Sequence, residues 1–135
     1  MSTDAYANKF SDNFRLAASK LLLLPDDATY NIIKIPKWAF VMDVWVQIVT
    51  AFTLDASITV GWFGNGETAV LDGFITNEIA QPSVVGVKRA FNSTIETFPG
   101  KFFSGAAGAV TATVLDNNGV VGSFRVFIQF SVIHA

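Results

Sequence analysis

Residues 40 to 48 read Phe40-Val41-Met42-Asp43-Val44-Trp45-Val46-Gln47-Ile48. Apolar side chains occupy every even position of this stretch, whereas the odd positions include an acid, a tryptophan and an amide. Successive side chains of a β-strand point to opposite faces, so this alternation predicts a long strand with one buried face. We expect the even residues, with Phe40 and Met42 among them, to lie in a hydrophobic core.

The last part of the chain alternates in the same way. One face of the predicted strand is entirely apolar and consists of Phe124, Val126, Ile128, Phe130 and Val132. The other face is mixed, because Phe127 and Ile133 share it with Arg125 and Gln129. We therefore expect a second long core strand, whose mixed face would suit a surface that another subunit half covers.

Shorter segments rich in β-branched and aromatic residues lie between these two strands. They are Tyr30 to Ile35, Ser57 to Phe63, Ala69 to Ile75, Ser83 to Phe91, Lys101 to Phe103 and Val110 to Leu115. Turn residues separate them at Gly64-Asn65-Gly66 and at Asn117-Asn118-Gly119, and the second set sits where a hairpin turn is expected. Many short strands with few helical signals predict an all-β, single-domain antiparallel β-sandwich that is jelly-roll-like.

The start of the chain permits two interpretations. Phe10, Phe14, Ala17 and Leu21 would share one face of a helix, yet residues from Ala18 to Leu24 could also form an edge strand. We expect a short N-terminal arm or short helix over residues 1–17, followed by the β-sandwich domain over residues 18–135.

Composition indicates a chain that associates with other subunits. Hydrophobic residues make up 51% and charged residues 15%, with 13 Phe and 3 Trp, whereas soluble domains usually carry about 25% charged residues. More large apolar surface is present than one small core readily hides. The interface candidates are Trp38, Trp45, Trp62, Phe127 and Ile133.

Two features allow more than one interpretation. The tryptophans could stack on sugars, although aromatic residues are also the largest contributors to core and interface area. The stretch of small residues from Gly105 to Ala109 is either a loop or a place where backbones approach closely at a subunit axis. If it is such an axis, a bulky residue at position 107 should weaken the oligomer.

The residues that enzymes use are scarce in this sequence. The chain has no cysteine and one histidine, His134, next to the C-terminus, and no acidic pair stands out as a proton-transfer couple. Asp116-Asn117-Asn118-Gly119 lacks the further ligands of a calcium loop. We therefore expect no enzyme activity, no cofactor and no metal site.

Charge and hydropathy argue against two further classes of partner. The net charge is −2 and the nine Lys and Arg residues are scattered, so no basic stripe would track a phosphate backbone. No apolar run approaches the roughly 20 residues of a spanning helix, and the first charged residue is Asp4, which is unlike a secretion signal. We expect neither nucleic acid nor a membrane as a partner.

One stretch resembles a known family. Ile33-Lys34-Ile35-Pro36-Lys37-Trp38 leads into the long strand, Val49-Thr50-Ala51-Phe52 follows it, and Ser57-Ile58-Thr59-Val60-Gly61 forms the next strand. This succession is similar to that of the small β-sandwich virion proteins of tailed bacteriophages. The resemblance covers about residues 31 to 71, with weaker agreement in the final strand.

The resemblance implies a function and carries over no site residues. It implies a capsid decoration, or cement, protein that binds the outer capsid shell and stabilises it. The implied partners are the major capsid protein and further copies of the chain, as a homotrimer, and the implied location is the outer capsid surface of the virion after synthesis in the host cytoplasm. The alternative is a tail, fibre or baseplate module that binds a receptor or carbohydrate.

Overall fold

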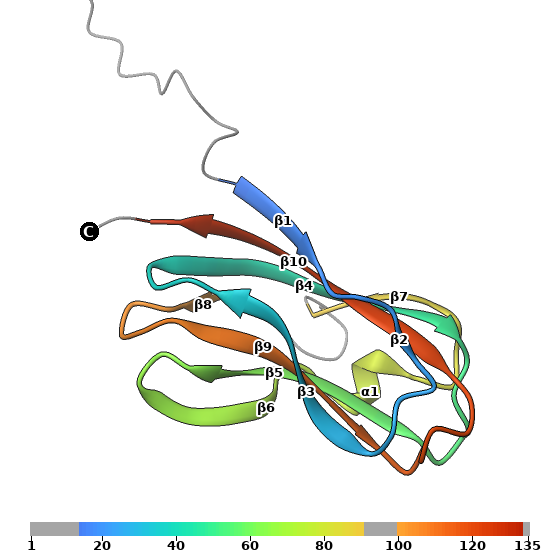
Figure 1. Cartoon of the computed structure of the whole chain (residues 1–135). Helices are drawn as coiled ribbons and strands as arrows, with labels where there is room; N and C mark the ends of the chain where they lie inside the picture. The colour runs from blue at the N-terminus through green and yellow to red at the C-terminus, as the bar shows by residue number, and fades with distance from the viewer. Residues whose placement is uncertain (1–13, 91–99, 134–135) are drawn as a thin grey trace, which may run out of the picture.

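Two antiparallel β-sheets lie face to face in the computed structural model, which describes residues 14–90 and 100–133 (Figure 1). Sheet A has the order β1 (Phe14–Ala18), β10 (Ser123–Val132), β4 (Ala39–Thr50) and β7 (Gly86–Arg89), while β2 (Leu22–Leu23) also pairs with β10 and β8 (Lys101–Phe102) with β4. Sheet B has the order β3 (Ala28–Ile35), β9 (Gly108–Leu115), β5 (Ser57–Gly64) and β6 (Glu67–Ile75). One short helix, α1 (Asn77–Ala80), follows β6.

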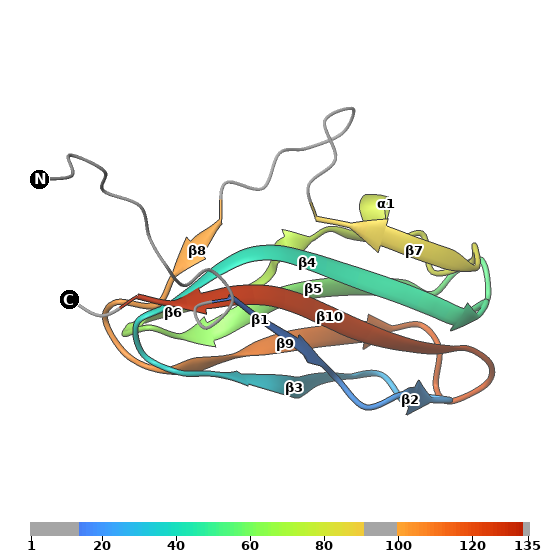
Figure 2. The same ribbon diagram turned by 90° about the horizontal axis from the view of Figure 1, so that it is seen from above.

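The order of the strands is that of a jelly roll. The chain crosses from β3 in sheet B to β4 in sheet A, returns to sheet B at β5, and crosses again from β9 to β10 (Figure 2). These sequence neighbours therefore lie in opposite layers. The prediction of an all-β, single-domain, jelly-roll-like antiparallel sandwich is therefore confirmed.

The core lies between the two sheets and consists mainly of aliphatic residues. Val44, Val46 and Ile48 of β4 are buried beside Val126 and Ile128 of β10. From sheet B, the same layer receives Ile58, Val60, Val110, Ala112 and Val114, all with no exposed surface. Each large side chain buried here contributes roughly 1.5–3 kcal/mol, which explains why a cysteine-free chain of this length holds the sandwich by packing.

A β-bulge changes which residues of β4 face the core. Val44 pairs with Ile128 and Val41 with Phe130, so Met42 is the extra residue of the bulge. The buried positions consequently shift from even numbers to odd numbers toward the start of the strand, where Val41 and Ala39 are fully buried. The expectation that Phe40 and Met42 lie in the core is wrong, because both are only half-buried.

Two turns that look alike in sequence have different roles. Asn65 and Gly66 have φ of 58° and 70° and join β5 to β6 as a two-residue hairpin turn. Asn117-Asn118-Gly119 instead carries the chain from β9 in sheet B to β10 in sheet A, so the predicted hairpin is wrong. The Asp27 carboxylate holds this crossover, because its two oxygens accept hydrogen bonds from the backbone N–H groups of Asp116, Asn117 and Asn118 at 2.7–2.9 Å.

Strand β1 begins inside the segment that was expected to be an arm or short helix. Residues 14 to 18 pair antiparallel with β10, from Phe14 opposite Ser131 to Ala18 opposite Phe127. Because Ala17 packs against the core, the segment gains apolar contact as an edge strand of sheet A. The rest of the predicted arm, residues 1–13, lies outside the described residues, as does His134.

Candidate functional site

The outer face of sheet A carries two of the predicted interface residues side by side. Trp45 of β4 and Phe127 of β10 are directly opposite each other in the strand register, and both are half-buried. Leu16 of β1, opposite Gln129, and Val87 of β7, opposite Gln47, flank them with exposed fractions of 70% and 60%. We call Leu16, Trp45, Val87, Arg89 and Phe127 the sheet A patch.

An ion pair fixes the polar part of this patch. Arg89 lies opposite Trp45 on β7, and its guanidinium carbon is 5.7 Å from the centre of the indole ring. The guanidinium also binds the Asp43 carboxylate, with an Nε to Oδ2 distance of 3.1 Å and a closer contact through Nη2. Since Asp43 is only 6% exposed and also accepts the Val44 N–H at 2.8 Å, it anchors Arg89 against the Trp45 ring.

Trp38 and Ile133 meet at the end of the same sheet. The Ile133 N–H donates a hydrogen bond of 2.7 Å to the Trp38 carbonyl oxygen, which brings the loop before β4 beside the end of β10. Phe102 of β8 joins them with its ring 6.2 Å from that of Trp38 and 6.4 Å from that of Phe40. Ile133 and Phe102 are 46% and 36% exposed, so this end cluster also presents apolar surface.

Trp62 belongs to the other sheet, where it lies on β5. It is opposite Val110, whose side chain is fully buried, and it packs on Phe74 with ring centres 5.0 Å apart. Its indole N–H donates to Glu67 at 3.3 Å, and the Lys101 ammonium lies 4.7 Å from the ring centre. The hydrogen bond from Lys101 also lowers the pKa of Glu67 below its ordinary value.

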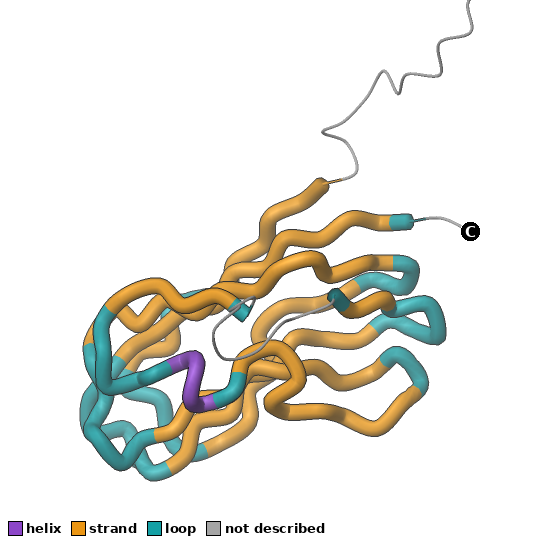
Figure 3. Tube along the Cα trace, turned by 180° about the vertical axis from the view of Figure 1, so that it is seen from behind, coloured by secondary structure: helices purple, strands orange, loops and turns teal. Residues whose placement is uncertain are grey.

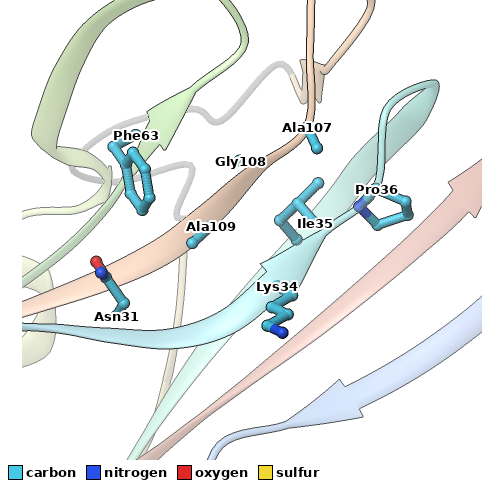
Figure 4. Close-up of a pocket in the computed structure, with 8 residues that line it drawn as sticks. All are labelled: Asn31, Lys34, Ile35, Pro36, Phe63, Ala107, Gly108 and Ala109. Atoms are coloured by element: carbon cyan, nitrogen blue, oxygen red, sulfur yellow. The ribbon is translucent and has the colours of Figure 1, made fainter.

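A shallow apolar hollow of about 520 Å³ opens beside β3 on the outer side of sheet B (Figure 4). Phe63 of β5 and Ala109 of β9 line it together with Ile35 and Pro36, and Lys34 lies at its margin. Ala107, from the stretch of small residues, also lines this hollow. An added Cβ at Gly108 would meet the Phe63 carbonyl oxygen at 2.1 Å, so close contact within the chain explains part of that stretch.

The sequence analysis missed several exposed apolar and charged residues that the fold gathers. Leu16, Val87 and Arg89 belong to the sheet A patch, and the buried Asp43 holds Arg89 in place. Strand pairing brings β1 and β7 to either side of the β10–β4 pair, and no local pattern states which strands become neighbours. A second set missed is the loop around β2, where Leu21, Leu23 and Leu24 are 40–67% exposed.

Within residues 14–90 and 100–133, no group of three or more His, Asp or Glu side chains is placed to hold a metal ion. In the same ranges no helix has the length and apolarity to cross a membrane.

Comparison with known proteins links this fold to phage capsids. No protein-family model and no curated protein sequence matches the chain. Three solved structures contain chains of similar fold: the acidic stable capsid of Helicobacter pylori bacteriophage KHP30, the capsid asymmetric unit of cyanophage Pam1 and the capsid of Ralstonia phage GP4.

The likeness extends over nearly the whole chain. The TM-scores are 0.64, 0.62 and 0.65, with 17%, 15% and 11% identity in the same order. The matches cover 88%, 97% and 99% of this chain, and 87%, 94% and 93% of the matched chain in each phage structure. At these identities they establish a shared fold. The protein is thus a jelly-roll β-sandwich of a kind that occurs in phage capsids.

Proposed function

We propose that this chain is a structural virion protein of a tailed phage, a capsid decoration or cement protein that binds the outer shell and stabilises it. The observation that carries the proposal is the whole-length match in fold to chains from three phage capsids. The family resemblance of the sequence around residues 31 to 71 points the same way independently.

The proposed partners are the major capsid protein and further copies of this chain in a homotrimer. The sheet A patch supports this, because it combines aromatic and arginine side chains, the types enriched at the centres of protein interfaces, with the exposed aliphatic side chains of Leu16 and Val87. Trp45 and Arg89 are held in place by strand pairing and by the Asp43 ion pair, so little side-chain freedom is lost when a partner covers them.

The proposed mechanism is stabilisation by burial and involves no reaction. A subunit that covers apolar area on two neighbouring capsid subunits lowers the free energy of the assembled shell by about 25 cal/mol for each Å² removed from water. Binding only to the assembled state stabilises that state by mass action. The end cluster of Trp38, Phe102 and Ile133 offers a second contact area on the same chain.

Heat challenge of particles tests the proposal directly. Particles that lack the protein should release their DNA at a lower temperature than complete particles, and purified protein added back should restore the original temperature. Protein with Trp45→Ala and Phe127→Ala should restore it less, at equal concentration. Equal heat resistance with and without the protein would contradict the stabilising role.

A further inference from the structure

Four of the connections between the two sheets lie together at one end of the sandwich. We call this surface the loop end, and it consists of residues 24–27, 51–56, 76–85 and 116–122. Ser123, at the start of β10, is opposite both Leu23 and Thr50. In the other sheet Ser57 is opposite Leu115, so the four connections leave the strands at the same end. Figure 3 shows these loops in teal beside the purple helix α1.

The four connections contact one another and form one surface. The Leu24 N–H donates a hydrogen bond of 2.9 Å to the Gly122 carbonyl oxygen, which joins the first connection to the last. The Phe52 ring covers Gly122, where an added Cβ would lie 2.5 Å from the ring. The Phe52 N–H in turn donates a hydrogen bond of 2.9 Å to the Pro82 carbonyl oxygen. Because the loops hold one another in place, little freedom is lost when a partner covers them.

Each of these connections exposes aliphatic surface. Leu54, in the turn before β5, is 89% exposed. Four further side chains of the loop end are 48–68% exposed, and they are Leu24, Val84, Val85 and Val120. Turns are usually built from Gly, Pro, Asn, Asp and Ser. Single exposed apolar residues are normal, whereas a group of them at one place indicates an interaction site.

The charges of the loop end have one sign. Five of its side chains are exposed carboxylates, and they are Asp26, Asp27, Asp55, Glu78 and Asp116. The four connections contain no lysine and no arginine. The loop end therefore combines aliphatic side chains with a concentrated negative charge.

Three cations border the loop end without matching its charge. Lys20 lies between β1 and β2, Arg125 lies on β10, and Lys88 lies on β7. The Lys88 ammonium is bound to the carbonyl oxygens of Gln81, at 3.3 Å, and of Val84. None of the residues outside the described ranges adjoins one of the four connections along the chain. Among the described residues, the carboxylates of the loop end thus outnumber the cations around it.

This combination selects the kind of partner. The loop end of a second copy would bring carboxylates against carboxylates, and like charges across an interface oppose binding. Nucleic acid and anionic lipid carry the same sign and are repelled as well. A protein surface with basic and apolar side chains complements both features of the loop end.

We infer that the loop end binds the capsid shell at a surface where the major capsid protein presents lysine or arginine side chains beside apolar ones. This inference deepens the proposed function and rests on it. The sandwich then contacts the shell with one end, and the sheet A patch on its side stays free for neighbouring copies.

Binding to particles that lack the protein tests the charge, with the purified full chain as the probe. Asp55→Lys reverses one exposed charge of the loop end, and Asp72→Lys reverses an exposed charge on β6 as the matched control. We expect Kd to rise at least about tenfold with Asp55→Lys and less than about threefold with Asp72→Lys, because only the first charge faces the partner. The difference should narrow at high salt, which screens exposed charges.

A second variant tests the apolar part without a change in charge. Leu54→Ala with Val120→Ala removes two largely exposed side chains, so stability in urea should stay close to that of the wild type. We expect Kd for the particles to rise at least about tenfold. Leu71→Ala, at a partly exposed apolar residue of β6, should leave Kd unchanged. Sedimentation should show wild-type self-association in all of these variants.

The outcomes separate this inference from the proposed function. If the wild type binds the particles and both loop-end variants bind equally well, the inference fails and the decoration role survives. Equal losses in the loop-end variants and in their controls would also overturn it. Wild-type binding to phosphatidylcholine vesicles that Leu54→Ala abolishes would replace the shell by a lipid surface. Absence of wild-type binding to the particles contradicts the proposed function itself.

Discussion

Trp45 and Phe127 lie directly opposite each other on β4 and β10, at the centre of the outer face of sheet A. Arg89 extends the same cross-strand row on β7 and is bound by the nearly buried Asp43. A cross-strand aromatic pair with a fixed guanidinium is a rigid contact surface, because its geometry is set by backbone pairing before any partner arrives.

Removing both rings should weaken self-association. For Trp45→Ala with Phe127→Ala we expect the dissociation constant to rise at least about tenfold, since large aromatic side chains at interface centres contribute most of the binding free energy. Sedimentation equilibrium measures the constant. Val120→Ala, an exposed apolar residue in the β9–β10 crossover, is the matched control and should leave the constant unchanged. An unaltered constant in the double variant would contradict the role of the sheet A patch.

Loss of Arg89 should destabilise the fold through Asp43. In Arg89→Ala the Asp43 carboxylate remains almost buried without its charged partner, which costs about 1–3 kcal/mol of unfolding free energy. Adding Asp43→Asn should recover part of that loss, because the amide carries no charge. Urea unfolding gives the values, and Lys34→Ala on exposed β3 should change stability by less than about 0.5 kcal/mol. A loss no greater than that of Lys34→Ala would contradict the structural role of the ion pair.

Asp27 should make the fold sensitive to acid. Hydrogen bonds from the backbone N–H groups of Asn118, Asn117 and Asp116 lower the pKa of Asp27 below its ordinary value of 3.8. A carboxyl whose pKa is lower in the folded state contributes stability above its ordinary pKa, and that contribution is lost as the pH falls through the folded value. Tm should therefore fall below about pH 4.

The matched variant is Asp27→Asn, which cannot titrate. Its Tm should fall less steeply below pH 4 than that of the wild type, while at neutral pH its Tm should be lower because an amide accepts these bonds less well. Parallel curves for the two proteins across the acid range would show that Asp27 does not carry the effect.

Gly61 should tolerate no side chain. A Cβ there would lie 1.9 Å from the Val70 carbonyl oxygen, where β6 runs close to β5. We expect Gly61→Ala to cost at least about 3 kcal/mol, because backbone must move to relieve the overlap. At Gly66, with φ of 70° and open space around it, alanine should cost only about 1–2 kcal/mol. Equal unfolding free energies for the two variants would contradict this account.

The period-two pattern predicted strand positions well and faces less well. Val44, Val46 and Ile48 face the core as expected, but Phe40 and Met42 do not, because the bulge at Met42 reverses the alternation. The even positions stay apolar through the bulge, so the alternation in the sequence continues without a break. The side chains nevertheless change faces at Met42. A bulge depends on the partner strand and leaves no local signal here.

Pairing between distant strands limited the prediction of the site. Alternation in the sequence placed Phe127 and Gln129 on a mixed face of the last strand and Trp45 on the non-core face of the strand over residues 40 to 48. Nothing local showed that Phe127 and Trp45 would lie opposite each other. Trp62 looked equivalent to Trp45 in sequence, but the fold covers it with Lys101 and Glu67. The turn at Asn117 looked like that at Asn65, although its flanking strands belong to different sheets.

The position of the chain in purified phage particles tests the central claim most directly. In a reconstruction of complete particles by electron cryomicroscopy, we expect the jelly-roll sandwich in density on the outer face of the capsid shell, in contact with at least two major capsid subunits. Density for this chain confined to the tail, fibres or baseplate would contradict the decoration role and favour a receptor- or carbohydrate-binding module.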